Sequence, residues 1–380
     1  MVHEKRNFGL DLMRALAILF VLIHHWVAGN LSPIPAFSKY VPYFYILGYY
    51  GVEIFFVLSG FLIGNIIIKG FLNEADYGRP FILNFWMRRW FRTLPLYYFI
   101  LFVTIFTTAV IKGEAITGLW KYFLFLQNFF GYNNDFYGIS WSLSIEEWFY
   151  LSFPIILLLV HRLLKNSVSR KNIIFIVIII YLICPMLVRV FYSALENPLW
   201  SESLRKAVIC REDSIAFGVL GAFWYNTRKQ SFINNKKPML FVGILLLVIT
   251  SAVFMNDILS DYYYKTNDAT FFSKTIYFSL VNLAVLFTLP YCFGVTCNVP
   301  IIKNSVSFIS KISYSLYLTH VFVHHIVHKL IPKTGGIYTI INLILFAAIC
   351  AGLSSLTYHF VENTFLKLRD KVWKEKYKPA

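Results

Sequence analysis

The sequence has little charge, and little of that charge is negative. Only 14% of its 380 residues are charged, with 19 Asp and Glu against 35 Lys and Arg. Charged residues normally make up about a quarter of a soluble domain. It also lacks a Gly/Ser-rich or Pro-rich linker that would divide the chain. We therefore expect one domain, residues 1–380, and we exclude an ordinary soluble fold.

Cysteine is scarce as well. The five cysteines are scattered through apolar segments, without the spacing of a disulfide framework or a zinc site. We expect buried, unreactive thiols. They are Cys184, Cys210, Cys292, Cys297 and Cys350.

Long apolar runs are what the sequence has in abundance. Hydrophobic residues make up 58% of it, and the mean hydropathy is +0.62. Runs of about 18 residues or more, enough for a helix to cross the hydrocarbon core, recur along the chain. We predict an all-α integral membrane protein with about ten transmembrane helices in one bundle. The predicted spans are 9–28, 43–68, 93–111, 141–162, 173–192, 208–226, 239–256, 275–295, 308–331 and 337–361.

The net charge of +16 raises the question of a nucleic-acid partner. If both termini are cytoplasmic, most Lys and Arg fall in the segments on the inner side, which is the positive-inside pattern. This distribution explains the basic charge without nucleic acid. We expect a multi-pass protein of the inner or plasma membrane, with the tail "KLRDKVWKEKYKPA" lying on anionic lipid headgroups.

The first predicted span carries charged residues at an unusual spacing. It lacks the small-residue cleavage site of a signal peptide, so we expect it to remain as a helix. Eleven residues at 3.6 per turn place Arg14 and His25 on nearly the same face, about 16 Å apart along the axis, with Asp11 on that side. His24 points about a quarter-turn away. Each residue alone could be a structural ion pair or hydrogen bond, but a shared face favours a functional site.

Other predicted spans also contain polar residues that are costly in a bilayer. Glu53 lies ten residues into an apolar helix, and Glu146 and Glu147 lie near the outer end of the fourth span. The remaining ones are Arg211 and Asp213 near the outer end of the sixth span, and His320 near the middle of the ninth.

Three arginines precede the third span, on its cytoplasmic side. Flanking arginines are ordinary topology signals. However, Arg88 and Arg92 are one turn apart on one helix face, and Arg89 lies beside them. This spacing suits bidentate binding of phosphates.

Five segments, in this order, carry a family resemblance: "GLDLMRALAILFVLIHH", "GVEIFFVLSGFLIG", "RRWFRTLP", "WSLSIEEWFYLSFP" and "SYSLYLTHVF". Together they resemble the acyltransferase-3 family of polytopic membrane acyltransferases. The resemblance implies ten membrane helices, an acyl-coenzyme A donor and O-acylation of surface carbohydrate. Some members carry a C-terminal SGNH-type hydrolase domain; this sequence ends without one, so we expect the stand-alone form.

The resemblance also implies site residues. Arg14 and His25 match the essential arginine and histidine of the first span. Arg88, Arg89 and Arg92 match the functional arginines before the third span, and Glu146 and His320 match the acid and the histidine of the later motifs.

The residues themselves suggest a mechanism. Transfer of an acyl group from a thioester to a sugar hydroxyl needs a base, and His25 is our candidate. Glu146 or Glu53 could orient its imidazole. Arg211 or Tyr317 could stabilise the oxyanion, and we group Asp213 with them as substrate-binding residues. The arginine cluster, together with Arg14, would bind acyl-coenzyme A, with acetyl as the expected acyl group and a carbohydrate or glycolipid as acceptor.

Two other classes of protein remain open. A transporter or flippase of glycans or lipids would also place ionisable residues in the membrane, although the two halves show no paired, Gly/Pro-broken spans. A di-iron oxygenase is suggested by "HVFVHH", but nine histidines are too few for several histidine boxes. We therefore expect no metal.

Overall fold

The computed structural model describes residues 6–73, 78–131, 136–331 and 335–376. Within these ranges the chain is helical and contains no strand. The long helices are α1 (Phe8–Leu31), α3 (Tyr45–Asn73), α4 (Arg79–Phe106), α6 (Trp141–Leu164), α7 (Arg170–Glu196), α8 (Glu212–Thr227), α10 (Lys236–Val253), α13 (Tyr277–Phe293), α14 (Pro300–Leu330) and α15 (Ile337–Thr357). The shorter helices are α2 (Pro35–Ser38), α5 (Trp120–Phe123), α9 (Lys229–Asn234), α11 (Leu259–Tyr264), α12 (Phe271–Thr275) and α16 (Asn363–Lys376).

Each of the ten predicted spans coincides with a long helix, which confirms an all-α polytopic membrane protein. Among the described residues, seven helical runs are long and apolar enough to cross a membrane by length and composition. Three of the long helices lie outside this group: α8 and α13, which have 16 and 17 residues, and α14, which is long but rich in Ser and His. Ten crossings therefore remain a prediction.

One predicted loop is shorter than expected. The helix that was predicted to end at 256 continues through a π-helical turn, Phe254–Ile258, into α11. Only residues 265–270 lie between α11 and α12. The apolar and tyrosine-rich sequence after residue 256 explains the extension, because it supports a further amphipathic turn.

Local signals fix where several helices begin. The Asn7 side chain accepts a hydrogen bond from the backbone N–H of Leu10 at 3.0 Å and caps α1. Ser169 caps α7 in the same way. Pro80 and Pro300 lie in the first turns of α4 and α14, where a missing N–H costs no hydrogen bond.

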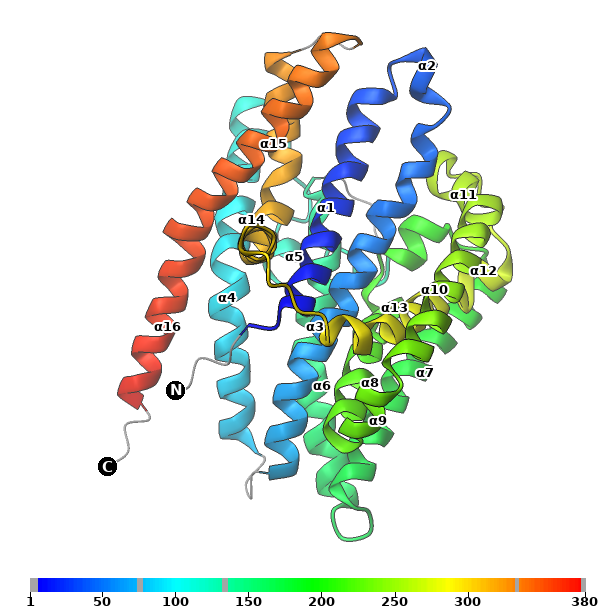
Figure 1. Cartoon of the computed structure of the whole chain (residues 1–380), viewed down its shortest axis with the longest axis vertical. Coiled ribbons are helices and arrows are strands. Elements are labelled where there is room, and N and C mark those ends of the chain that lie inside the picture. Colours follow the sequence, from blue (N-terminus) through cyan, green and yellow to red (C-terminus); the bar gives the residue numbers. More distant parts are fainter. Residues whose placement is uncertain (1–5, 74–77, 132–135, 332–334, 377–380) are drawn as a thin grey trace.

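The helices pack around two central elements, α1 and α3 (Figure 1). α1 packs against α3 and α14, and α3 packs closely against α8. The close approach depends on glycine, since a Cβ at Gly60 would overlap the carbonyl oxygen of Ile215, and a Cβ at Gly218 would overlap that of Val57. Small residues let membrane helices approach in this way.

Candidate active site

A basic cavity lies between α1, α3, α4, α6 and α14. Its volume is about 1030 Å³. Its charged lining comprises six basic side chains and three acidic ones, so it favours an anionic ligand. The basic residues are Arg6, Arg14, Lys69, Arg89, Arg92 and Lys311, and the acidic ones are Asp11, Glu146 and Glu362.

The cavity changes character along its length. Several of its cations are exposed, among them Lys69 and Arg92. Its other wall residues include the buried side chains of Ser142 and Tyr317, whose hydroxyl oxygens are 2.6 Å apart. A charged, open part therefore leads to a buried polar part.

The predicted polar face of α1 exists, and it faces α14. Asp11 binds both Arg6 and Arg14, at 2.8 and 3.3 Å. Ser310 of α14 donates a hydrogen bond to Asp11 at 2.7 Å and accepts one from Arg14 at 3.1 Å. Further along the same two helices, the ring centroids of His25 and His320 lie 4.7 Å apart. Arg14 and His25 thus both contact α14, as their spacing predicts.

His25 and His320 are held in the same way. Nδ1 of His25 lies 2.9 Å from the carbonyl oxygen of Val21, and Nδ1 of His320 lies 3.1 Å from that of Leu316. A carbonyl oxygen only accepts hydrogen bonds, so each neutral ring carries its proton on Nδ1 and leaves a lone pair on Nε2. Nε2 of His320 is buried without a hydrogen-bond partner among the described residues. Neither histidine is part of the described cavity lining, which ends at Tyr317, 5.9 Å from the His320 ring between centroids.

His24 has different surroundings. Its ring is buried against Tyr45, with centroids 4.6 Å apart, and it fills the space that a side chain at Gly48 would need. His25 remains partly exposed. The two neighbouring rings therefore serve different surfaces of α1, in agreement with the predicted quarter-turn.

The two adjacent glutamates of α6 also diverge. Glu146 lines the cavity and accepts a hydrogen bond from the Tyr150 hydroxyl at 2.7 Å; that hydroxyl also bonds Ser59. Glu147 is buried and accepts a hydrogen bond from Thr93 at 2.7 Å. Glu146 is therefore the glutamate available to a ligand.

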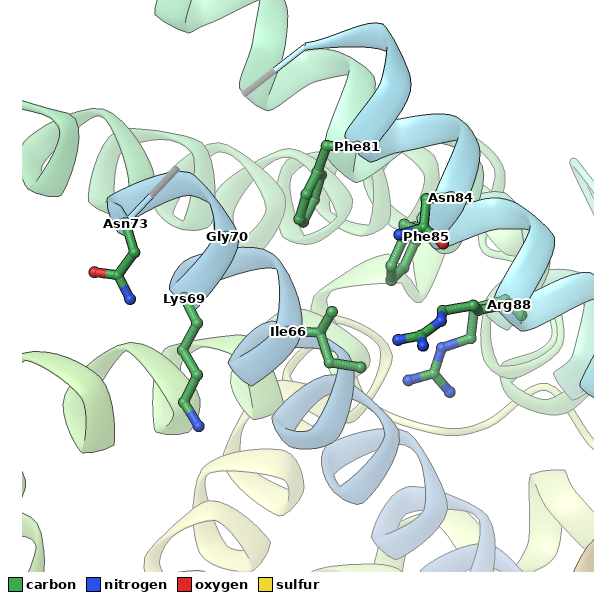
Figure 2. Close-up of a pocket in the computed structure, with 9 residues that line it drawn as sticks. Ile66, Lys69, Gly70, Asn73, Phe81, Asn84, Phe85 and Arg88 are labelled. Carbon is green, nitrogen blue, oxygen red and sulfur yellow. The ribbon is translucent and has the colours of Figure 1, made fainter. Parts of the chain in front are cut away.

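The three arginines of α4 surround two neighbouring cavities. Arg92 lines the large cavity, Arg88 lines a smaller one of about 420 Å³, and Arg89 lines both. Figure 2 shows the smaller cavity, with Arg88 on one wall and Lys69 on the α3 side. The Arg89 guanidinium lies 5.5 Å from the centre of the Tyr150 ring.

The structure places the other predicted site residues in ion pairs. Arg211 binds Oε1 of Glu53 at 2.5 Å, and both side chains are fully buried. Arg189 binds Asp213 at 2.8 Å, also fully buried. None of these four residues belongs to the described lining of the large cavity. We expected Glu53 beside His25 and Arg211 at the oxyanion. In the structure these charges instead neutralise one another between α3, α7 and α8.

Some functional candidates were missed. Ser310 bridges Asp11 and Arg14, and no local pattern singled it out, because the contact joins two helices far apart in the sequence. Glu362 lines the cavity and accepts a hydrogen bond from Ser315 at 3.2 Å. The Val21 carbonyl had no sequence signal, because any residue supplies one.

The histidines beyond His320 form no cluster with acidic residues or cysteine. His324 bonds Asn30 at 3.2 Å, and its ring lies 6.3 Å from that of His328. In the part of the chain that is described, no group of three or more His, Cys, Asp or Glu is arranged to hold a metal ion.

The protein is therefore a multi-helix membrane bundle with a basic cavity and with two facing imidazoles on neighbouring helices. Comparison with known sequences identifies the family: the profile of the acyltransferase domain, acyltransferase-3, matches residues 7–358. The chain belongs to this family.

Individual relatives agree with the family assignment. The chain is 29% identical over 399 residues to "Putative O-acetyltransferase SAR0937" of Staphylococcus aureus (strain MRSA252), covering 98% of this chain and 59% of that protein. It is 26% identical over 382 residues to "O-acetyltransferase OatA" of Staphylococcus aureus (strain NCTC 8325 / PS 47), covering 94% of this chain and 57% of that protein.

A third relative is "Putative peptidoglycan O-acetyltransferase YrhL" of Bacillus subtilis (strain 168), 28% identical over 215 residues, covering 52% of this chain and 30% of that protein. The chain thus spans less than two thirds of the length of these relatives. No solved structure matches it.

Proposed function

We propose that the protein is a membrane O-acyltransferase. It moves an acyl group, preferentially acetyl, from cytoplasmic acyl-coenzyme A to a hydroxyl of a cell-surface or exported carbohydrate. The observation that carries this proposal is the cavity, with its excess of positive charge and its buried polar part. Coenzyme A has phosphates at one end and a thioester on a slender arm at the other. Guanidinium groups bind phosphates well, and a volume of this size holds a cofactor-sized molecule.

The names of the relatives support the acyl group and the acceptor. Each is described as an O-acetyltransferase, and one name specifies peptidoglycan. A glycan acceptor places the product outside the cell membrane. The basic rim of the cavity would then face the cytoplasm, with both chain termini on that side, in line with the positive-inside pattern.

His25 is the base in the proposed reaction. Its Nδ1–H donates to the Val21 carbonyl, so Nε2 is free to take the proton of the acceptor hydroxyl. The hydroxyl oxygen then bonds to the thioester carbonyl carbon, the C–S bond breaks, and the coenzyme A thiolate takes the proton from Nε2. His320, in ring contact with His25, limits the orientations that the His25 ring can adopt.

The cavity residues position the donor. Asp11 and Ser310 hold the Arg14 guanidinium in place, and Arg89 and Arg92 supply further phosphate ligands. The hydroxyls of Ser142 and Tyr317 lie at the buried part of the cavity, where they bond each other and Tyr317 also donates to the Ile139 carbonyl; one of these hydrogen bonds would be exchanged for a bond to the thioester oxygen. Glu146 lines the same cavity, and its carboxylate can accept a hydrogen bond from the pantetheine amides.

The test uses purified protein in nanodiscs with acetyl-coenzyme A labelled in the acetyl group. We expect label to move to a glycan hydroxyl as a hydroxylamine-sensitive ester. Movement of unmodified glycan across a membrane without ester formation would instead assign the protein to transport and overturn the proposal.

A further inference from the structure

Arg205 is a buried cation without an acidic partner. It ends the π-helical turn Trp200–Arg205, between α7 and α8, and is only 5% exposed. Among the described residues no group accepts a hydrogen bond from its guanidinium, and its Nε is buried without a partner. The nearby Glu202 is bonded to Lys206 at 2.8 Å. Buried charges are normally paired, so this unpaired guanidinium is suited to bind an anionic ligand.

Aromatic rings surround the Arg205 guanidinium. Its central carbon lies 4.6 Å from the ring centre of Trp141, 5.0 Å from that of Tyr262 and 5.7 Å from that of Tyr49. Ring faces attract a cation and offset part of the cost of its burial. They do not satisfy the planar N–H donors of the guanidinium as an oxygen would, so these donors remain available to a carboxylate or a phosphate.

A series of ring contacts connects the surroundings of Arg205 with His25. From Tyr262, ring contacts lead to Tyr45 at 5.4 Å and from there to His24 at 4.6 Å, next to His25. The turn that ends at Arg205 follows the C-terminal end of α7. The loop between α6 and α7 lies at the other end of this helix, on the predicted inner side, so Arg205 is expected on the outer side.

We propose that the Arg205 guanidinium, held between the buried rings of Tyr49 and Trp141, binds the acidic group of an anionic sugar, and that the enzyme selects acceptors that carry this negative charge. The inference deepens the proposed function, on which the word acceptor rests. The partly exposed ring of Tyr262 suits the apolar face of a sugar, and the guanidinium binds its acid group. The hydroxyl to be acylated then lies toward His25.

Binding of a matched pair of sugars tests the proposal without any donor. Glucuronate and glucose share a ring and differ in the carboxylate. The measurement is the equilibrium affinity of each for the purified protein in nanodiscs, by calorimetry. We expect glucuronate to bind at least about tenfold more tightly than glucose, which is the scale of one charge-assisted contact. Equal affinities, or no binding of either sugar, would overturn the proposal.

Three variants locate the charge that is responsible. Arg205→Met should remove the preference for glucuronate. Lys206→Met removes a neighbouring positive charge that is already paired with Glu202, and it should keep the preference. Should Arg205→Met fail to fold, Arg205→Lys decides: it keeps a cation between the rings but loses the planar pair of donors, so the preference should shrink several-fold. An unchanged preference in the Arg205 variants contradicts the site.

A transfer measurement separates this role from oxyanion stabilisation. With acetyl-coenzyme A present, Arg205→Met should lower transfer to a methyl glucuronide more than transfer to a methyl glucoside. Equal losses would mean that Arg205 acts on the reacting carbonyl, and the acceptor proposal would fall. If the wild type binds glucuronate but acylates nothing, the proposed function fails while the anion site stands.

Discussion

At the scale of single residues, two adjacent histidines have separate tasks. His25 is partly exposed, contacts His320 and has its Nδ1 proton held by Val21, whereas His24 is buried against Tyr45. In the proposed reaction His25 acts as the base on the acceptor hydroxyl and does not contact the donor phosphates.

We therefore predict that His25→Ala abolishes glycan acylation, by about a hundredfold or more, while the affinity for coenzyme A stays close to that of the wild type. His24→Ala should leave a substantial specific activity and instead lower the melting temperature, because it leaves a gap in a packed site. The measurements are ester formation, coenzyme A binding and thermal unfolding. Loss of ester formation in His24→Ala, together with normal ester formation in His25→Ala, would contradict the assignment of His25 as the base.

The arginines of α4 give a second prediction. Arg89 lines both cavities, so Arg89→Lys should weaken coenzyme A binding several-fold, and Arg89→Ala by about tenfold or more, because lysine keeps the charge but not the planar fork. Lys165→Ala, which changes a basic residue at the end of α6 outside both described cavities, is the matched control. If the affinities do not follow this order, the arginines of α4 do not bind coenzyme A and only mark the cytoplasmic side of the helix.

Sequence patterns predicted some parts of the site and missed others. Helical periodicity placed Arg14 and His25 on one face because both residues belong to one helix, and the structure confirms that face. Glu53 and Arg211 were misplaced, because an ion pair between α3 and α8 depends on tertiary packing that no local pattern reports. The same limit hid the contact of Ser310 with Asp11.

At the scale of elements, buried ion pairs tie α3, α7 and α8 together. Arg211 and Glu53 are fully buried, so removing one partner leaves an uncompensated charge. We predict that Arg211→Met or Glu53→Gln alone destabilises the protein strongly, by about 3–5 kcal/mol. The double variant should be less destabilised than the sum of the two. Additive losses in thermal or denaturant unfolding would show that the two residues are not coupled.

The contact between α3 and α8 depends on missing side chains. Gly218 meets the backbone of Val57 and Phe61, so Gly218→Ala should force the helices apart and cost about 1–3 kcal/mol. A Cβ added at Gly352 of α15 would meet no described atom within 4 Å, and Gly352→Ala should be neutral or slightly stabilising. Equal melting temperatures for the two variants would contradict the close packing.

Element positions were easier to predict than their ends. Apolar runs located every long helix, because the bilayer demands length and hydrophobicity of each span. They did not predict that α11 and α12 would occupy most of 257–274, since short helices depend on packing more than on composition.

At the scale of the whole molecule, the proposed transfer requires one fixed orientation of the protein in the membrane. The loop 265–270 between α11 and α12 should be outside, and the end of α6 should be inside. In a variant without native cysteines, Thr266→Cys should react with an impermeant maleimide in intact cells, and Ser167→Cys should react only after permeabilisation. Both side chains are exposed, so access depends on the side of the membrane alone. The opposite labelling pattern would show that the protein has the inverse orientation in the membrane.

The central claim is that an acyl group passes from a cytoplasmic donor to an outer acceptor through one molecule. The most direct measurement uses sealed proteoliposomes of known orientation, with labelled acetyl-coenzyme A on one side and glycan on the other. We predict ester formation only when the donor is on the side of Lys69 and Arg92 and the glycan is on the opposite side, with none in His25→Ala. Ester formation only when donor and glycan share a side, or full activity in His25→Ala, would contradict it.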